Sequence, residues 1–257
     1  MHPKGKVCVV TGAASGIGEA VARAFAEAGA RGVVVADLSG DKLAAVARDI
    51  GGLAVPTDVG QEAAVKALIA AAESKYGPVD IFFSNAGLSR KGQQDASDAD
   101  WDVSWRVHVM SHVYAARALV PGMLERGSGY LLNTASAAGL LASLNSMPYG
   151  VTKSAAVALA EHLAIQYRDR GIRVSVLCPQ AVLTGMTTQG PSAARVDGVL
   201  MPADVARIVM QAMEEERFLI LSHPTVHEYM QRKASNLDRW INGMRRLRDK
   251  TYGSRVA

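Results

Sequence analysis

The sequence predicts an α/β fold in which a parallel β-sheet is covered by helices on both faces. Short apolar runs alternate along the chain with segments of helical periodicity, and this alternation indicates βαβ units. A glycine cluster at residues 12–18 joins the first run to the first helical segment. Because crossovers between parallel strands are right-handed, the carboxyl ends of the strands meet at one sheet edge, where open α/β sheets bind ligands.

The first half of the predicted fold rests on apolar runs that are rich in β-branched residues. They predict strands at residues 6–10, 32–36, 53–56 and 79–83. Apolar residues at helical spacing predict helices from the glycine cluster to residue 29, at 41–50, at 61–76 and over a long region at 97–126.

The second half continues the alternation. Strands are predicted at 130–134, 172–177 and 218–221, and helices at 146–170, 202–216 and 226–247. Ser146 can cap the helix at 146–170, and Pro148 suits its first turn. No repeat or linker interrupts the chain, so we expect one domain over 1–257. This domain would carry a lid-like segment at about 185–201, rich in Gly, Pro and Ser, and a C-terminal helical extension at about 224–250.

Composition is typical of a soluble globular protein, since 49% of the 257 residues are hydrophobic and 20% are charged. The first residues do not resemble a signal peptide, and no uncharged apolar run approaches the ~20 residues that span a bilayer. Cys8 and Cys178 both fall in strand-like apolar runs, as small buried residues would. We therefore expect a cytoplasmic protein with no membrane partner.

Positive charge is concentrated near the C-terminus. Residues 231–257 hold eight lysines and arginines against two aspartates, within a net charge of +4 for the chain. A nucleic-acid surface is one interpretation of this tail. The solvated face of a terminal helix is the favoured one, so we expect no nucleic-acid partner.

The glycine cluster has the features of a phosphate-binding loop. Gly12, Gly16 and Gly18 allow a tight turn and close approach of a phosphate to a helix N-terminus. Asp37 ends the second predicted strand and can accept both ribose hydroxyls of an adenosine, while it repels a 2′-phosphate. Leu38 follows it, and no Arg or Lys lies in the loop. These residues favour NAD over NADP.

Tyr149 and Lys153 lie four residues apart and so share a helix face. A tyrosine titrates near ~10 unaided, and a nearby cation favours its phenolate form. The pair therefore suits a tyrosine that acts as an acid or base near neutral pH.

These motifs together resemble the short-chain dehydrogenase/reductase (SDR) family. The resemblance runs from about residue 6 to 184 and rests on Thr11-Gly-x-x-x-Gly-x-Gly18, Asn85-Ala-Gly87 and Tyr149-x-x-x-Lys153. It implies a three-layer, doubly wound Rossmann-type fold with a seven-stranded parallel sheet. It also implies hydride transfer between a nicotinamide and a carbinol or carbonyl carbon, with Tyr149 as the acid/base and no metal.

The resemblance also assigns roles to individual residues. Ser136 matches the serine that holds the substrate oxygen, and Lys153 matches the lysine that binds the nicotinamide ribose and lowers the tyrosine pKa. Asp58 matches the aspartate that contacts the adenine edge. The implied cofactor-binding residues are Gly12, Ser15, Gly16, Ile17, Gly18, Asp37, Leu38, Asp58, Val59, Asn85, Ala86, Gly87, Tyr149, Lys153, Pro179, Val182 and Thr184.

Two positions depart from the family pattern. His108 stands where an asparagine usually helps to hold a water that links the lysine to solvent. A histidine there could relay protons as a fourth catalytic residue, or it could be packed in place on its helix. Gln180 follows Pro179 where glycine is common, and its amide could face the substrate pocket or be a tolerated loop side chain.

The sequence says less about the substrate. The expected pocket walls are Leu88, Ser89, residues 140–147 and the lid-like segment. Leu140, Leu141, Leu144, Met147 and Met186 favour a compact, apolar substrate, and no pair of converging arginines indicates a carboxylate or phosphate group.

We therefore expect an NAD-dependent dehydrogenase of a secondary alcohol, or a reductase of the matching ketone. By resemblance, the long helices around His108 and after Tyr149 would pair into a homodimer or homotetramer. The alternative function is a catalytically silent dinucleotide-binding scaffold or sensor. The intact Ser136, Tyr149 and Lys153 count against this alternative.

Overall fold

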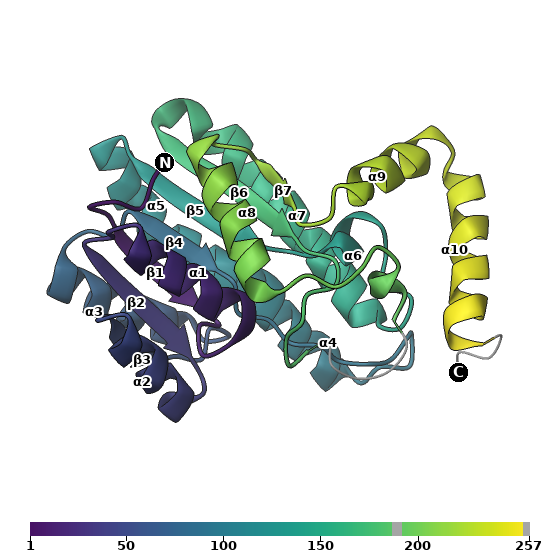
Figure 1. Cartoon of the computed structure of the whole chain (residues 1–257), viewed down its shortest axis with the longest axis horizontal. Helices are drawn as coiled ribbons and strands as arrows, with labels where there is room; N and C mark the ends of the chain where they lie inside the picture. The colour runs from purple at the N-terminus through teal and green to yellow at the C-terminus, as the bar shows by residue number, and fades with distance from the viewer. Residues whose placement is uncertain (187–191, 254–257) are drawn as a thin grey trace.

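A seven-stranded parallel sheet forms the centre of the structure, a computed structural model that describes residues 1–186 and 192–253 (Figure 1). The strand order is β3-β2-β1-β4-β5-β6-β7, so the sheet winds outward in opposite directions from β1 and β4. This order confirms the predicted doubly wound fold. The strands are β1 Val7–Thr11, β2 Gly32–Asp37, β3 Leu53–Pro56, β4 Ile81–Ser84, β5 Gly129–Thr134, β6 Ile172–Cys178 and β7 Leu219–Leu221.

Helices cover both faces of the sheet, as predicted (Figure 1). Alternate side chains of β1 divide between two cores: Cys8 and Val10 pack on one face, and Val7 and Val9 on the other. The first face is covered by α1 Gly16–Glu27, α2 Gly40–Asp49 and α8 Pro202–Glu214, and the second by α3 Glu62–Tyr76, α5 Ser111–Arg126 and α7 Met147–Tyr167. Burial on both sides explains why the strands are continuously apolar.

The region predicted as one helix at 97–126 is divided into three parts. It begins with α4 Asp98–Trp105, passes through a π-helical turn, η1 Arg106–Met110, and continues as α5. A π turn inserts an extra residue without a break in helical hydrogen bonding, so hydrophobic spacing does not reveal it. The turn matters for the site because it holds His108, which is fully buried.

The C-terminal region also differs from the single helix predicted at 226–247. It contains α9 Thr225–Ser235 and α10 Leu237–Tyr252, which are separated by Asn236 in an extended conformation. The Asn236 side chain accepts a hydrogen bond from the Arg239 amide at 2.8 Å and so caps α10. In Figure 1, α10 stands apart from the sheet, on the side of α6 Ala137–Leu140.

Within the predicted lid-like segment at 185–201, residues 187–191 lie outside the described part of the chain. The remainder contains a short helix, η3 Ala193–Arg195, and Leu200 forms a β-bridge with Val182. A second short helix, η2 Arg168–Arg170, follows α7. None of the described helices has both the length and the apolar character that a membrane crossing requires.

Candidate active site

The predicted site residues gather at the carboxyl edge of the sheet. The glycine loop follows β1, Asp37 ends β2 and Leu38 follows it, and Asp58 and Val59 follow β3. The same edge receives Asn85, Ala86 and Gly87 after β4, Ser136 after β5, and Pro179, Val182 and Thr184 after β6. Tyr149 and Lys153 come from the first turns of α7.

The glycine loop packs so closely on neighbouring segments that side chains at Gly12 or Gly16 would collide with them. A Cβ atom on Gly12, whose φ is +66°, would lie 2.7 Å from the Ala86 Cα, and one on Gly16 would lie 3.0 Å from the Thr184 Cγ2. Ser15 is exposed at the start of α1, and its side chain makes no capping hydrogen bond there. The backbone donors at the N-terminus of α1 therefore lie beside the glycine loop, in an arrangement that suits a phosphate group.

Asp37 ties this loop to the end of β2. One of its carboxylate oxygens accepts a hydrogen bond from the Ala14 amide at 3.1 Å, and the other accepts from the Leu38 amide at 2.7 Å. Asp58 is exposed after β3, and its carboxylate accepts from the Gly60 amide at 2.9 Å. Both carboxylates thus lie at the carboxyl edge of the sheet, where the resemblance places the adenosine half of the cofactor.

Thr11, the first residue of the glycine motif, fixes the loop after β4. The Thr11 hydroxyl accepts from the amides of Asn85 and Ala86, at 2.9 and 3.1 Å. The Asn85 side chain donates to the Thr11 carbonyl at 3.1 Å and accepts from the Thr134 hydroxyl at the same distance. Three strand ends are thereby locked together, a role that residue type and spacing alone do not indicate.

The catalytic candidates meet at the end of β5. Ser146 caps α7 by accepting a hydrogen bond from the Tyr149 amide at 3.1 Å. Ser136 caps α6 through the Ala138 amide, also at 3.1 Å, and its hydroxyl interacts with the Tyr149 side chain. The Lys153 ammonium is buried, lies 5.8 Å from the centre of the Tyr149 ring, and donates to the Thr134 carbonyl at 2.9 Å.

The charge balance of this group differs from the sequence-based expectation. Burial raises the pKa of Tyr149 above its usual value, and its interaction with Ser136 opposes this only in part. Burial also lowers the pKa of Lys153 to about 8. The lysine lies over the ring and bonds a carbonyl, so its proximity alone does not produce the predicted lowering of the tyrosine pKa.

His108 is held from both sides in the π turn. His108 Nδ1 lies 2.8 Å from the Thr152 hydroxyl, which also donates to the Pro148 carbonyl at 2.7 Å. His108 Nε2 lies 3.0 Å from the Leu88 carbonyl oxygen and 3.2 Å from the Leu88 amide nitrogen, and the tautomer of the ring decides which of these contacts is the hydrogen bond. Its ring meets the Tyr149 ring edge-on, with the centres 5.5 Å apart.

Burial and the positive charge of Lys153 lower the pKa of His108 to about 2, so the imidazole is neutral at physiological pH. This geometry favours the packed alternative for His108. Participation in a proton relay stays a prediction.

The buried ammonium leads to a prediction about stability. Because the folded-state pKa of Lys153 is below its unfolded value, the folded protein binds fewer protons, and stability rises with pH through about 8. Compared with Lys153→Met, the wild type should gain about 1 kcal/mol of unfolding free energy between about pH 7 and about pH 9. Urea unfolding at both pH values measures this. The control Lys42→Met replaces an exposed lysine of α2 and should gain as much unfolding free energy between the two pH values as the wild type does. If Lys153→Met showed the same gain as the wild type, the prediction would be contradicted.

A pocket of about 770 Å³ opens beside Ser136 and Tyr149. Of the expected walls, Ser89, Leu141, Leu144 and Met186 line it, as does Gln180. Among the described residues that were expected there, Leu88, Leu140 and Met147 are not part of its lining. The far wall comes from α9 and α10.

Gln180 is oriented by a carboxylate. Its Nε2 donates to Asp197 at 2.9 Å, and the Tyr229 hydroxyl donates to the other oxygen of Asp197 at the same distance. This arrangement favours the alternative in which the Gln180 amide belongs to the pocket.

Comparison with known proteins extends this description. The chain is 38% identical over 239 residues to the 1-deoxy-11-beta-hydroxypentalenate dehydrogenase of Streptomyces exfoliatus, which covers 87% of this chain and 85% of the relative. A crystal structure of a short-chain dehydrogenase/reductase from Burkholderia phymatum in complex with NAD is 31% identical, with a TM-score of 0.84, over 93% of this chain and 96% of the other.

A second solved structure, L-sorbose reductase from Gluconobacter frateurii complexed with NADPH and L-sorbose, has a TM-score of 0.76 at 28% identity. It covers 86% of this chain and 96% of that one. The family model for short chain dehydrogenases matches residues 6–194, which include the glycine loop and the Ser136, Tyr149 and Lys153 group. The chain therefore belongs to the short-chain dehydrogenase/reductase family of oxidoreductases.

Proposed function

We propose that the protein is an NAD-dependent oxidoreductase that transfers hydride between a secondary alcohol, or the matching ketone, and a nicotinamide. The observation that carries this proposal is the meeting of Ser136 and Tyr149 on the wall of one pocket, with the Lys153 ammonium buried behind them. The glycine loop at the N-terminus of α1 and the carboxylates of Asp37 and Asp58 support a dinucleotide site at the same edge of the sheet.

Each side chain then has a defined task. When bound, the oxidised nicotinamide supplies a hydride acceptor and a positive charge that favours the Tyr149 phenolate. Tyr149 takes the hydroxyl proton of the alcohol, and Ser136 donates a hydrogen bond to the substrate oxygen. Lys153 holds a ribose hydroxyl and adds a second positive charge. His108 acts as a positioning residue, because its edge contact fixes the Tyr149 ring.

The direct test is a panel of secondary alcohols with NAD and of ketones with NADH, followed by nicotinamide absorbance. The relative named for a pentalenate makes carboxylates a necessary part of the panel. Turnover of panel members supports the proposal. NADH binding without turnover of any member would favour the silent scaffold instead.

Asp37 underlies the choice of NAD. Its carboxylate would repel the 2′-phosphate of NADPH, and solved members of the family have been found with either NAD or NADPH. We expect NADH to bind about tenfold more tightly than NADPH. Asp37→Asn removes the charge and keeps one oxygen acceptor, for either the Ala14 or the Leu38 amide, so it should bring the two affinities close together.

Fluorescence titration with both cofactors measures the Asp37 effect. Asp41→Ala removes an exposed carboxylate from the first turn of α2 and should retain the preference for NADH. Tighter binding of NADPH by the wild type would refute this assignment.

A further inference from the structure

The far wall of the substrate pocket is one face of α10. Two adjacent ridges of this helix reach the pocket: an apolar ridge of Trp240, Met244 and Leu247, and a ridge of Arg239, Gly243 and Arg246. Residues four and three apart lie above one another on a helix, so each ridge is continuous. Trp240 packs against a cluster that contains Leu141 and Val226, and the Tyr252 hydroxyl accepts from the Ala193 amide at 3.3 Å. Both ends of α10 are thus attached to other pocket walls.

The charged residues on this pocket have a single sign. Lys91, Arg195, Arg232, Arg239 and Arg246 line it, whereas no Asp or Glu belongs to the lining that the structure describes. Neither acid of α10, Asp238 or Asp249, is on this lining, and Asp249 forms an ion pair with Arg248, which is not on it either. A cavity with one sign of charge and apolar walls attracts the opposite charge.

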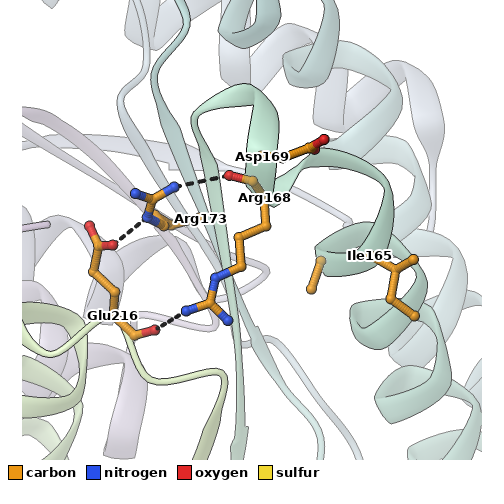
Figure 2. A pocket seen from close by; sticks show the side chains of 6 residues that line it. Ile165, Arg168, Asp169, Arg173 and Glu216 are labelled. Carbon is orange, nitrogen blue, oxygen red and sulfur yellow. Dashed lines mark hydrogen bonds and ion pairs between the residues drawn. The ribbon is translucent and has the colours of Figure 1, made fainter.

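A second hollow of the molecule contains two arginines whose guanidinium groups both have hydrogen-bond partners (Figure 2). There, Arg173 pairs with the Glu216 carboxylate and donates to the Arg168 carbonyl at 3.1 Å, and Arg168 donates to the Glu216 carbonyl at 3.4 Å. In the substrate pocket, Arg232 has a comparable partner, Glu228, at 3.3 Å. Within residues 1–186 and 192–253, by contrast, the side chains of Lys91, Arg239 and Arg246 form no ion pair or hydrogen bond.

We propose that the substrate carries a carboxylate at the end remote from its carbinol or carbonyl carbon, and that Arg239 and Arg246 bind this carboxylate. The inference rests on the proposed function, since it takes Tyr149 as the place where the reacting carbon lies. An apolar body between the two ends packs on Leu141, Met186 and Trp240. Guanidinium groups suit this task because they bind carboxylates with paired hydrogen bonds.

This substrate class differs from the compact, apolar molecule that the sequence favoured. Arg239 and Arg246 do not stand out in the sequence as a converging pair. They reach the pocket only because the helix is broken at Asn236 and α10 then lies along the pocket. The pocket volume of about 770 Å³ also leaves room for a ligand longer than a compact alcohol.

The test compares keto acids with their uncharged methyl esters as substrates. The probes are methyl ketones that bear a terminal carboxylate, in a series of increasing chain length, assayed with NADH. At the best length, KM for the acid should be about tenfold lower than for its ester, as two modest ion pairs would give. The double variant Arg239→Gln/Arg246→Gln should raise KM for the acid about tenfold and leave kcat and the ester KM unchanged.

A matched control removes the same charge from the same helix. Arg245→Gln/Arg248→Gln alters two arginines of α10 that do not line the pocket, so it should retain the preference for the acid. Added salt offers a measurement that needs no variant. Raising NaCl from about 0.05 M to about 0.5 M should raise KM for the acid and not for the ester, because salt screens exposed charges.

Failure of this inference is distinguishable from failure of the proposed function. Equal KM values for acid and ester, with turnover of both, would overturn the carboxylate assignment and leave the oxidoreductase intact. An equal loss in both double variants would also overturn it, because a general charge effect would then explain the data. If no probe is turned over, calorimetric titration of the NADH complex with dodecanoate decides. Binding that weakens about tenfold only in Arg239→Gln/Arg246→Gln supports the carboxylate site, and unchanged binding refutes it.

Discussion

Replacement of Tyr149 by phenylalanine is expected to lower kcat/KM by about 10³-fold, while NADH binding stays close to that of the wild type. The variant loses only the hydroxyl, which is the group that exchanges a proton with the substrate oxygen. The phenylalanine ring keeps its edge contact with His108 and its place below the Lys153 ammonium. The glycine loop that would hold the cofactor is therefore undisturbed, and the loss of activity should appear in kcat.

Steady-state kinetics on the best panel substrate and fluorescence titration with NADH measure these two effects. Tyr167→Phe is a matched control, since Tyr167 ends the same helix and stacks against Arg170 with 5.9 Å between the guanidinium and the ring centre. It should leave both quantities unchanged. Substantial turnover by Tyr149→Phe would show that Tyr149 is not the acid/base. The proposed mechanism would then be wrong.

The central strands of the sheet could be predicted from sequence because they are buried on both faces. Val33, Val34 and Val35 of β2 are all buried, and such runs stand out from the amphipathic helices between them. The π turn at His108 escaped prediction for the opposite reason: its residues continue a helical pattern, and only the added residue shifts their direction. The break at Asn236 depends on a single cap and gave an equally weak signal.

The residues of the site could be predicted from the sequence, but their pKa values could not. The gathering of Ser136, Tyr149 and Lys153 follows from strand ends that share one edge. The pKa of Tyr149 depends on how far the folded chain buries it and on which group receives the Lys153 ammonium. Here the Thr134 carbonyl receives it, and burial raises the pKa of Tyr149 more than the hydrogen bond with Ser136 lowers it. The pocket arginines depend on where α10 lies, which no local pattern of residues indicates.

The tightest constraint in the cofactor loop lies at Gly18, and its replacement by alanine should be among the most damaging small changes in the chain. A Cβ atom there would lie 2.2 Å from the Gly12 carbonyl oxygen and 2.7 Å from the Asn85 side-chain nitrogen. Because the nearest atom belongs to the backbone, α1 must move away from the loop. We expect the unfolding free energy to fall by about 1–3 kcal/mol and NADH binding to weaken markedly.

Gly40→Ala makes the same chemical change at the start of α2, where an added Cβ would meet nothing within 4 Å. It should be neutral or stabilise the protein by up to about 1 kcal/mol, because alanine restricts the unfolded chain. Urea unfolding and NADH titration of both variants separate a general cost of alanine from the contact at Gly18. If Gly18→Ala bound NADH as the wild type does, a larger separation between α1 and the glycine loop would not weaken cofactor binding. The close packing of α1 on the glycine loop would then not be what positions the helix N-terminus for the cofactor.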